Sequence, residues 1–150
     1  MKLRTQARYS VRMMTAIAKL SSGNGPVGLG EVSRHCGISR RYLEQLVSPL
    51  RNAQLVRSLS GRKGGYALSK SPDQIKLGEI ITAAIGPIAV TECAADPQTC
   101  ISSEFCNCQA VWALINLRVN QVLNEYSLAD LMDGNFQEKI KKEIQSLATG

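Results

Sequence analysis

The chain has no long hydrophobic run, so the sequence predicts no membrane-spanning helix and no membrane partner. No stretch of its 150 residues is both apolar enough and long enough to cross a bilayer. The apolar run Val11–Leu20 is interrupted by Arg12 and Lys19, and no small-residue cleavage site follows it, which argues against a signal peptide. The length fits one domain, or a small domain with an extension, and we expect the protein in the reducing cytoplasm.

Histidine and paired cysteine motifs are also scarce, and their scarcity argues against an enzyme. His35 is the single histidine, no histidine lies near the clustered cysteines as a base, and no C-x-x-C motif is present. The C-x₂₋₄-C pairs typical of structural zinc sites are missing as well. We therefore expect no catalytic residues and no small-molecule substrate, and we interpret His35 as a partly exposed helix-end residue.

The net charge of the chain, +6 overall, is divided unevenly between its two halves. Residues 1–66 carry twelve Lys or Arg against two acidic residues, a net charge of +10. Residues 67–150 carry six basic and ten acidic residues, a net charge of −4. The basic half indicates a nucleic-acid partner at the N-terminal end, and a solvated basic face is the alternative.

Apolar spacing in the basic half predicts a helix-turn-helix. Apolar side chains recur on one helical face in three segments, Ala7–Leu20, Leu29–His35 and about Arg40 to Arg51. Cys36–Ser39 forms a tight turn between the last two, with Ser39 as the N-cap of the third helix. A helix, a glycine-containing turn and a second helix are the skeleton of this motif.

A glycine-rich hairpin follows the predicted helix-turn-helix. Val56–Leu59 and Tyr66–Leu68 are short strand candidates, and the segment between them carries Arg62 and Lys63 among its glycines. Backbone freedom at the tip and two cations there are the features that a DNA-binding wing needs.

The first turn of the third predicted helix carries two cations where the helix dipole disfavours them. Arg40 and Arg41 oppose helix stability at this position, and such a local conflict indicates a function. Phosphates would relieve the repulsion, and recognition helices enter the major groove with these residues foremost. The candidate DNA-binding residues are Ser39, Arg40, Arg41, Tyr42, Glu44 and Gln45 in this helix and Ser60, Arg62 and Lys63 in the wing.

The acidic half is expected to continue with a helix at Lys76–Ile85 and a long helix at about Gln109–Tyr126. Five apolar residues of the long helix recur at spacings of three and four, namely Trp112, Ile115, Val119, Val122 and Tyr126. This seam is suited to pairing with another helix in a homodimer, and packing on the chain's own core is the alternative. A helical turn through Met132 and a polar helix at Gln137–Leu147 should end the chain.

These elements predict a mainly α fold with a small β-hairpin wing, a winged helix-turn-helix plus a long dimerisation helix. We assign residues 1–85 to the winged helix-turn-helix DNA-binding domain. Residues 86–108 form a cysteine loop, and residues 109–150 form the dimerisation helix and a C-terminal helical tail.

Four of the five cysteines fall within sixteen residues of this loop: Cys93, Cys100, Cys106 and Cys108. In a reducing compartment such clustered thiols are better interpreted as metal ligands than as disulfides. An open loop suits an iron–sulfur cluster, and the C-x-C pair Cys106–Cys108 leaves a zinc site as an alternative. Buried structural cysteines explain a polar loop poorly. Cys36, within the helix-turn-helix, is interpreted as a small core residue.

Several segments together resemble the Rrf2 family of bacterial winged-helix transcriptional regulators, especially its IscR-like, cluster-sensing members. They are MKLRTQARYSV, GISRRYLEQLVSPLR, GRKGGYALS, GPIAVTEC and CQAVWALIN, which together cover nearly the whole chain. The resemblance implies a homodimer on a double-stranded DNA operator. It also implies a 2Fe–2S or 4Fe–4S cluster, of which we favour the 2Fe–2S form, with Cys93, Cys100 and Cys106 as ligands.

Departures from the family pattern leave the fourth ligand open. IscR-like members carry a histidine where this chain has Gln109, and nitric oxide sensors of the family use an aspartate where it has Arg8. Cys108 is our first choice, and a residue of the partner subunit or a small molecule is the alternative. Gln54 replaces a helix-ending glycine, where a left-handed backbone costs roughly 1 kcal/mol more than with glycine.

The sequence therefore predicts a transcriptional regulator, expected to be a repressor, whose affinity for DNA depends on an iron–sulfur cluster. The resemblance implies control of genes for cluster assembly, iron, or redox and nitrosative stress. The alternatives are a regulator with a structural zinc site, or one that responds to a metabolite or a partner protein.

Overall fold

The computed structural model describes residues 3–21, 25–99 and 105–150. Its elements follow the order α1 (Thr5–Leu20), α2 (Leu29–Cys36), α3 (Arg40–Asn52), β1 (Val56–Leu59), β2 (Gly65–Leu68), a 3₁₀ turn η1 (Pro72–Gln74), α4 (Leu77–Ile85), α5 (Glu92–Ala95), a 3₁₀ turn η2 (Pro97–Thr99), α6 (Asn107–Glu125), α7 (Leu128–Met132) and α8 (Phe136–Thr149). The mainly α fold with one β-hairpin is thus confirmed, and each predicted helix is present within one to two residues of its expected bounds.

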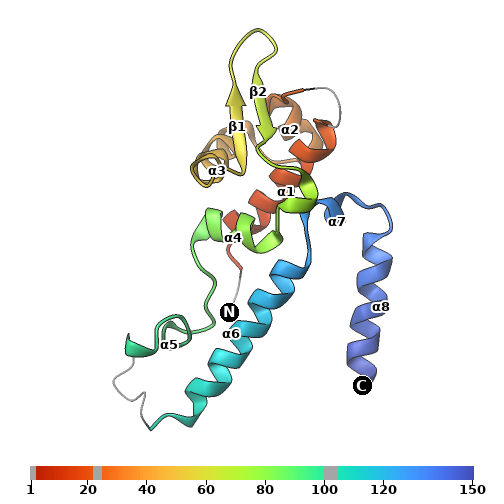
Figure 1. Ribbon diagram of the computed structural model, residues 1–150. Coiled ribbons are helices and arrows are strands. Elements are labelled where there is room, and N and C mark those ends of the chain that lie inside the picture. Colours follow the sequence, from red (N-terminus) through yellow and green to blue (C-terminus); the bar gives the residue numbers. More distant parts are fainter. Residues whose placement is uncertain (1–2, 22–24, 100–104) are drawn as a thin grey trace.

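Residues 3–85, here called the head, hold α1 to α4 and the wing around one apolar core. Helix α1 lies at the centre and packs against α2, α3 and α4 (Figure 1). Met13 and Ile17 of α1 are fully buried, as are Leu43 and Leu50 of α3. The predicted inward face of α3 is confirmed, because Leu46 and Val47 are buried on it too.

The wing is a two-stranded antiparallel sheet in which Val56 pairs with Leu68 and Leu59 with Gly65. Strand β2 is anchored to the chain just before α2, since Val27 and Tyr66 exchange two backbone hydrogen bonds of 2.8 Å. A side chain at Gly65 would overlap the carbonyl oxygen of Val27, so this close approach requires glycine.

The turn from α3 into β1 contains a left-handed residue that is not glycine. Gln54 has φ +58°, as expected from its place at the helix end, and among the described non-glycine residues it alone has a positive φ. The conformation is stabilised by backbone hydrogen bonds from Gln54 to Arg51 and from Leu55 to Leu50, at 2.9 and 3.0 Å. This turn places β1 beside the end of α3.

Residues 86–126, here called the extension, lead away from the head on the side opposite the wing. Helix α6 projects from the head, and α5 packs against it (Figure 1). The predicted cysteine loop, residues 86–108, contains the two short helical elements α5 and η2 in the structure. Helix α6 begins at Asn107, two residues before its predicted start, and so includes Cys108.

After α6 the chain contacts the head again, and α8 then extends away from it. The backbone amide of Leu128 donates to Ile75 at 2.8 Å, and the amide of Leu77 donates to Tyr126 at 3.0 Å. Helix α7 begins with a capping box between Ser127 and Asp130. Helix α8 follows α7 and extends away from the head (Figure 1), and none of its residues is buried. Within the described residues, no helix combines the length and the apolar character needed to cross a membrane.

Candidate DNA-binding surface and cysteine site

The turn between α2 and α3 has the geometry that the sequence predicts. Gly37 ends α2 in a left-handed conformation with φ +68°, and Ser39 begins α3 by accepting a 3.3 Å hydrogen bond from the amide of Tyr42. Ser33 donates to the carbonyl oxygen of Ile38 at 2.6 Å, which ties the turn to α2. The two helices are therefore held at a fixed angle by local hydrogen bonds and by the buried Ile38.

Polar and charged side chains occupy the outer face of α3. Arg40, Arg41, Glu44 and Gln45 are all exposed there. Arg40 pairs with Glu44 at 3.3 Å, but both side chains are more than half exposed, so the pair adds little stability. Arg41 makes no ion pair within the described residues. This face is available to a polyanion at the end of α3 where the free backbone amides lie.

Tyr42 differs from its neighbours because it is half-buried. Its ring meets Tyr9 of α1 edge-on at 5.9 Å, and the guanidinium of Arg12 lies 5.5 Å from the centre of the Tyr9 ring. Arg12 also donates to the carbonyl oxygen of Cys36 at 2.6 Å. Arg12 was missed as a functional candidate, and its signal was a cation within the apolar face of α1. These contacts position α3 on α1.

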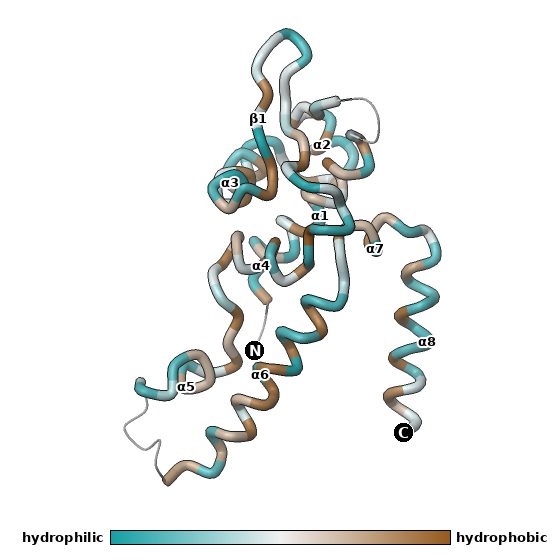
Figure 2. The backbone as a smooth tube through the Cα atoms, in the orientation of Figure 1, coloured by the Kyte–Doolittle hydropathy of each residue, from teal (hydrophilic) through white to brown (hydrophobic). Residues whose placement is uncertain are grey.

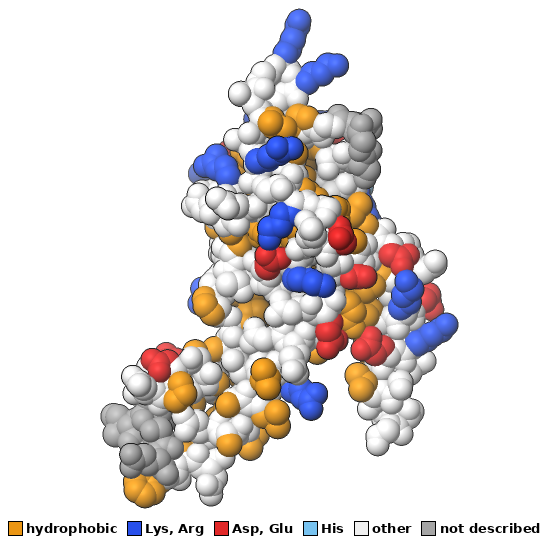
Figure 3. All heavy atoms as spheres, viewed as in Figure 1, with side chains coloured by type: hydrophobic (Ala, Val, Ile, Leu, Met, Phe, Trp, Pro, Cys, Tyr) orange, Lys and Arg blue, Asp and Glu red, His pale blue; other side chains and the backbone are white. Residues whose placement is uncertain are grey.

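The wing presents Ser60, Arg62 and Lys63 at its exposed tip. Neither cation forms an ion pair within the described part of the chain. Figure 3 shows cationic side chains over the wing and the head, whereas acidic ones gather toward α7 and α8. The outer face of α3 and the wing tip thus form two cationic projections at one end of the molecule.

The four clustered cysteines belong to residues 91–108, here called the cysteine segment, and the described ones lie in α5 and at the start of α6. Cys93 is half-buried in α5, Cys106 is the half-buried N-cap of α6, and Cys108 is exposed in its first turn. Cys100 lies outside the described residues. The three described thiols are free, and the Cys93 sulfur lies 3.2 Å from the hydroxyl oxygen of Thr91.

The donor chemistry of these thiols fits a soft metal or an iron–sulfur cluster. Across residues 3–21, 25–99 and 105–150, however, no three His, Cys, Asp or Glu side chains lie close enough together to hold a metal ion. The described residues alone do not form a complete site. Cys36 is buried in the head and His35 is exposed, as the sequence predicts.

Helix α6 exposes much of its apolar surface. Ile115 and Val119 of the predicted seam are half-buried, whereas Trp112 and Val122 are 38% and 50% exposed. The seam is therefore divided between a face packed on its own chain and a face open to solvent. Apolar residues recur along the whole helix (Figure 2), and the exposed ones are Val111, Trp112, Leu114, Leu117 and Val122. An exposed apolar surface of this kind is typical of an interaction face.

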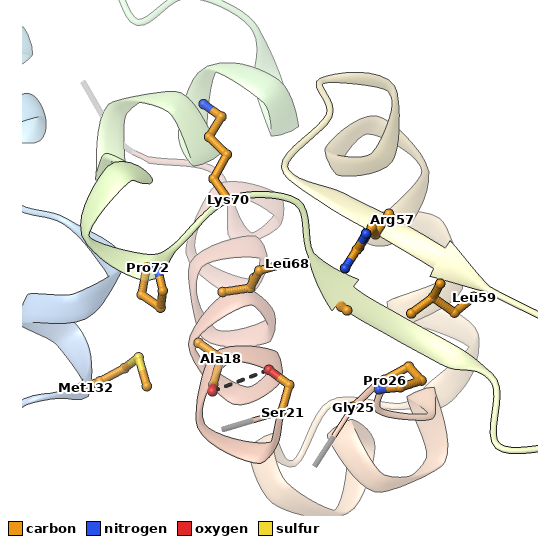
Figure 4. Close-up of a pocket in the computed structure, with 11 residues that line it drawn as sticks. Ala18, Ser21, Gly25, Pro26, Arg57, Leu59, Leu68, Lys70, Pro72 and Met132 are labelled. Atoms are coloured by element: carbon orange, nitrogen blue, oxygen red, sulfur yellow. Dashed lines mark hydrogen bonds between the residues drawn. The ribbon is translucent and has the colours of Figure 1, made fainter. Parts of the chain in front are cut away.

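A surface pocket of about 360 Å³ lies between α1, the wing and α7 (Figure 4). Its walls are mostly apolar and include Leu68, Pro72 and Met132. The guanidinium of Arg57 points toward the pocket, whereas Lys70 pairs with Glu79 at 2.8 Å (Figure 4). Apolar walls with a few convergent polar groups are a general property of small-molecule sites.

Hydrogen bonds stabilise two carboxylates in the first turns of α7 and α4, Asp130 and Glu79. The backbone and hydroxyl hydrogen bonds from Ser127, both 2.7 Å, hold the pKa of Asp130 below its usual value. A hydrogen bond from Lys70 lowers the pKa of Glu79 in the same way. Both groups are therefore ionised at neutral pH and contribute to α7 and α4.

Comparison with known proteins gives a consistent result. The Rrf2 family model, described as an iron-dependent transcriptional regulator, matches residues 3–134. The chain is 40% identical over 132 residues to the HTH-type transcriptional regulator IscR of Sodalis glossinidius. The matched region covers 88% of this chain and 79% of that protein.

Solved structures of two regulators have the same fold. The structure of CymR, the global cysteine regulator of B. subtilis, matches with a TM-score of 0.72 at 39% identity, covering 88% of this chain and 96% of that one. T. potens IscR matches with a TM-score of 0.71 at 33% identity, covering 88% and 86%. These relatives are regulators rather than enzymes, and the chain belongs to the Rrf2 family of DNA-binding transcriptional regulators.

Proposed function

We propose that this regulator is a repressor whose affinity for its operator is controlled by an iron–sulfur cluster bound to Cys93, Cys100 and Cys106. The observation that carries the proposal is the position of the described thiols, in α5 and at the start of α6, two elements that pack together. The resemblance to IscR-like regulators supports it and favours a 2Fe–2S over a 4Fe–4S cluster. The regulated genes would serve cluster assembly, iron, or redox and nitrosative stress.

Cys108 is the fourth ligand that the chain itself can best supply. It is exposed in the first turn of α6, two positions after Cys106. Gln109 is a poor cluster ligand and Arg8 cannot serve as one, because an amide and a guanidinium do not replace thiolate or imidazole. When bound, a cluster supplies iron–thiolate bonds that respond to oxygen, iron and reactive small molecules.

The chain's own residues would translate occupancy into a change of position. Thr91 caps α5 through the amide of Ala94 at 3.2 Å and keeps Cys93 near the packed face of α6. Ligation would join the thiols to one centre, so the cysteine segment would be more ordered with a cluster bound than without one. Helix α6 in turn contacts α4 of the head, so that the position of the segment can bias the head.

The DNA contacts are assigned to the outer face of α3 and to the wing. Ser39 and the arginines at the start of α3 would meet phosphates, and Glu44 and Gln45 would reach base edges in the major groove. Tyr42 would act mainly by holding α3 on α1, because it is half-buried and its ring meets Tyr9 edge-on. Ser60, Arg62 and Lys63 would meet the backbone of the operator beside the wing.

A homodimer explains the exposed apolar face of α6. Two copies of α6 would bury Leu114, Leu117 and their apolar neighbours, which a monomer leaves in water. Pairing two heads in this way would match two operator half-sites and would make their spacing depend on the extension.

The test is operator affinity measured at fixed salt with and without the cluster. We expect anaerobically purified protein to be brown, to contain iron and sulfide, and to bind the operator with a different affinity after the cluster is removed. Colourless protein with bound zinc would support the zinc alternative. Equal affinities in the two states would refute the switch. Cys108→Ala should destabilise the cluster toward air if Cys108 is a ligand, and Cys36→Ala should not.

A second candidate function, regulation by a metabolite, rests on the pocket at Arg57. Similarity to the cysteine regulator CymR gives this alternative some weight. A small carboxylate or phosphate in the pocket would lie between the wing and α1 and could change the angle of the wing. Arg57→Ala should leave operator affinity responsive to the cluster if the primary proposal holds.

A further inference from the structure

Three asparagines on α6 form a ladder along the side of the helix that faces the rest of the chain. Asn116, Asn120 and Asn124 are spaced by four residues, so they lie one above another on the helix. The side-chain amide of Asn120 donates to the carbonyl oxygen of Asn116, and that of Asn124 donates to Asn120, both at 2.9 Å. Asn116 and Asn120 are half-buried, beside the half-buried Ile115 and Val119.

The ladder binds the backbone of the linker that leads to the first cysteine. Asn116 accepts a hydrogen bond from the amide of Val90 at 3.3 Å, and Asn120 donates to the carbonyl oxygen of Ile88 at 3.4 Å. Residues 86–90 are neither helix nor strand, so their backbone groups lack the partners that regular structure provides. The side chains of Asn116 and Asn120 thus supply the hydrogen-bond partners that a neighbouring strand would supply in a sheet.

The two ends of the ladder reach the two functional regions. At one end, Val90 is three residues from Cys93 and next to Thr91, the cap of α5. At the other end, Asn124 lies against α4, where an added Cβ at Gly78 would be 2.6 Å from the Asn124 side-chain oxygen. Because α4 packs against both α1 and α3, a continuous chain of contacts runs from the cysteine segment to the helix that carries Arg41.

We propose that Asn116 and Asn120 are positioning residues that couple the cysteine segment to the head. Their hydrogen bonds hold the linker at a defined position along α6. A displacement of the cysteine segment is therefore transmitted through the linker to α6 and changes its position relative to α4. The coupling rests on the proposed function, because the cluster supplies the signal. The hydrogen bonds that hold the linker do not depend on a cluster. Physical continuity does not by itself establish coupling, so the test measures coupling directly.

One substitution made at two sites distinguishes the hydrogen bonds from general packing. Asn116→Asp keeps an oxygen that accepts from Val90, whereas Asn120→Asp removes the donor to Ile88 and places a carboxylate against carbonyl oxygens. Asn116→Leu removes the acceptor at similar volume. In the cluster-free protein we expect Asn120→Asp and Asn116→Leu to raise amide exchange over residues 90–96 roughly tenfold, and Asn116→Asp to leave it near the parent value.

The same variants are then compared in operator binding, with iron content and visible absorption matched to the parent. We expect the ratio of affinities with and without cluster to fall toward one for Asn120→Asp and Asn116→Leu, and to persist for Asn116→Asp. Unchanged amide exchange in Asn120→Asp would overturn the inference whether or not a cluster acts. Faster exchange with an undiminished ratio would overturn the coupling. A parent ratio of one would instead refute the proposed function, and with it the signal that the ladder carries.

Discussion

The head and the extension of this regulator are stabilised in different ways. In the head, buried apolar side chains of α1 to α4 make a continuous core, and every buried hydrophobic residue described lies there except Leu128 of α7. In the extension, no residue of α5 or α6 is buried, and asparagine hydrogen bonds hold the linker. The head is therefore stabilised by a buried core that includes Leu128 of α7, whereas few buried contacts stabilise the extension.

The difference suits the two roles. A rigid head presents α3 and the wing in a fixed geometry, as base readout requires. An extension with few buried contacts can be displaced at a low cost in free energy when its thiols are ligated or a partner binds. It can therefore act as a sensor.

The largest expected effect is on the core of the head. Leu50→Ala removes a fully buried side chain of α3, and we expect it to lower the free energy of unfolding by about 2–5 kcal/mol, because a cavity remains. Leu147→Ala in α8, where the side chain is 77% exposed, should change it by less than about 0.5 kcal/mol. Urea unfolding followed by circular dichroism measures both. Similar losses for the two variants would contradict the conclusion that the buried core of the head carries its stability.

The next effect concerns the apolar face of α6. Leu114 is 54% exposed in one chain, and a carboxylate buried there between two copies would be costly. We expect Leu114→Glu to raise the dimer dissociation constant at least about 100-fold, since each 1.4 kcal/mol corresponds to a factor of ten. Sedimentation equilibrium provides the measurement, with Leu147→Glu as the matched control. A dimer equally stable in both variants would exclude this face as the interface.

A smaller effect is expected at the turn between α3 and the wing. Gln54→Gly relieves the left-handed conformation at φ +58° and should stabilise the head by about 1 kcal/mol. Ala53→Gly, one residue earlier with φ −79°, should not stabilise it, because no strain is present there. Thermal unfolding of the two variants makes the comparison. A gain at position 53 equal to that at 54 would contradict the strain argument.

The smallest effect is the dependence on pH of the joint at α7. The pKa of Asp130 is lowered by hydrogen bonds from Ser127, so the folded state favours the ionised carboxyl. Its contribution is complete above the pKa of an unfolded aspartate, about 3.9, and is lost as the pH falls through the lower folded value. Asp130→Asn should therefore have a lower free energy of unfolding than the parent at neutral pH. When unfolding is measured between pH 5 and pH 3, at intervals of about one pH unit, the variant should lose less of this free energy than the parent. Parallel curves for the two proteins would show that Asp130 contributes nothing.

Much of the head could be predicted from local sequence rules. The inward residues of α3 follow from their spacing, Ser39 from its capping chemistry, and Gln54 from its place after a helix. The structure confirms each of these. The candidate DNA-binding residues could be chosen because charge that opposes helix stability is visible in sequence, and their contacts with DNA remain a prediction.

The extension was less predictable because its order comes from contacts between distant residues. Helix α5 within the expected loop depends on Thr91 and on packing against α6, and no periodic pattern of four residues could indicate it. From the sequence, the apolar seam of α6 was suited both to a second helix and to the chain's own core. In the structure Ile115 packs inward, whereas Val122 stays exposed. Arg12 and Asn120 act on backbone groups 24 and 32 residues away, which sequence spacing does not show.

The sequence by itself determined the charge division, the helix-turn-helix with its wing, and the clustering of four thiols, because these follow from composition, periodicity and turn chemistry. Only the tertiary structure decided which face of α6 stays open and which asparagines hold the linker. It also decided that α4 stands between the cysteine segment and α3. These depend on which surfaces meet after the head has buried its core, and that is a property of the whole chain.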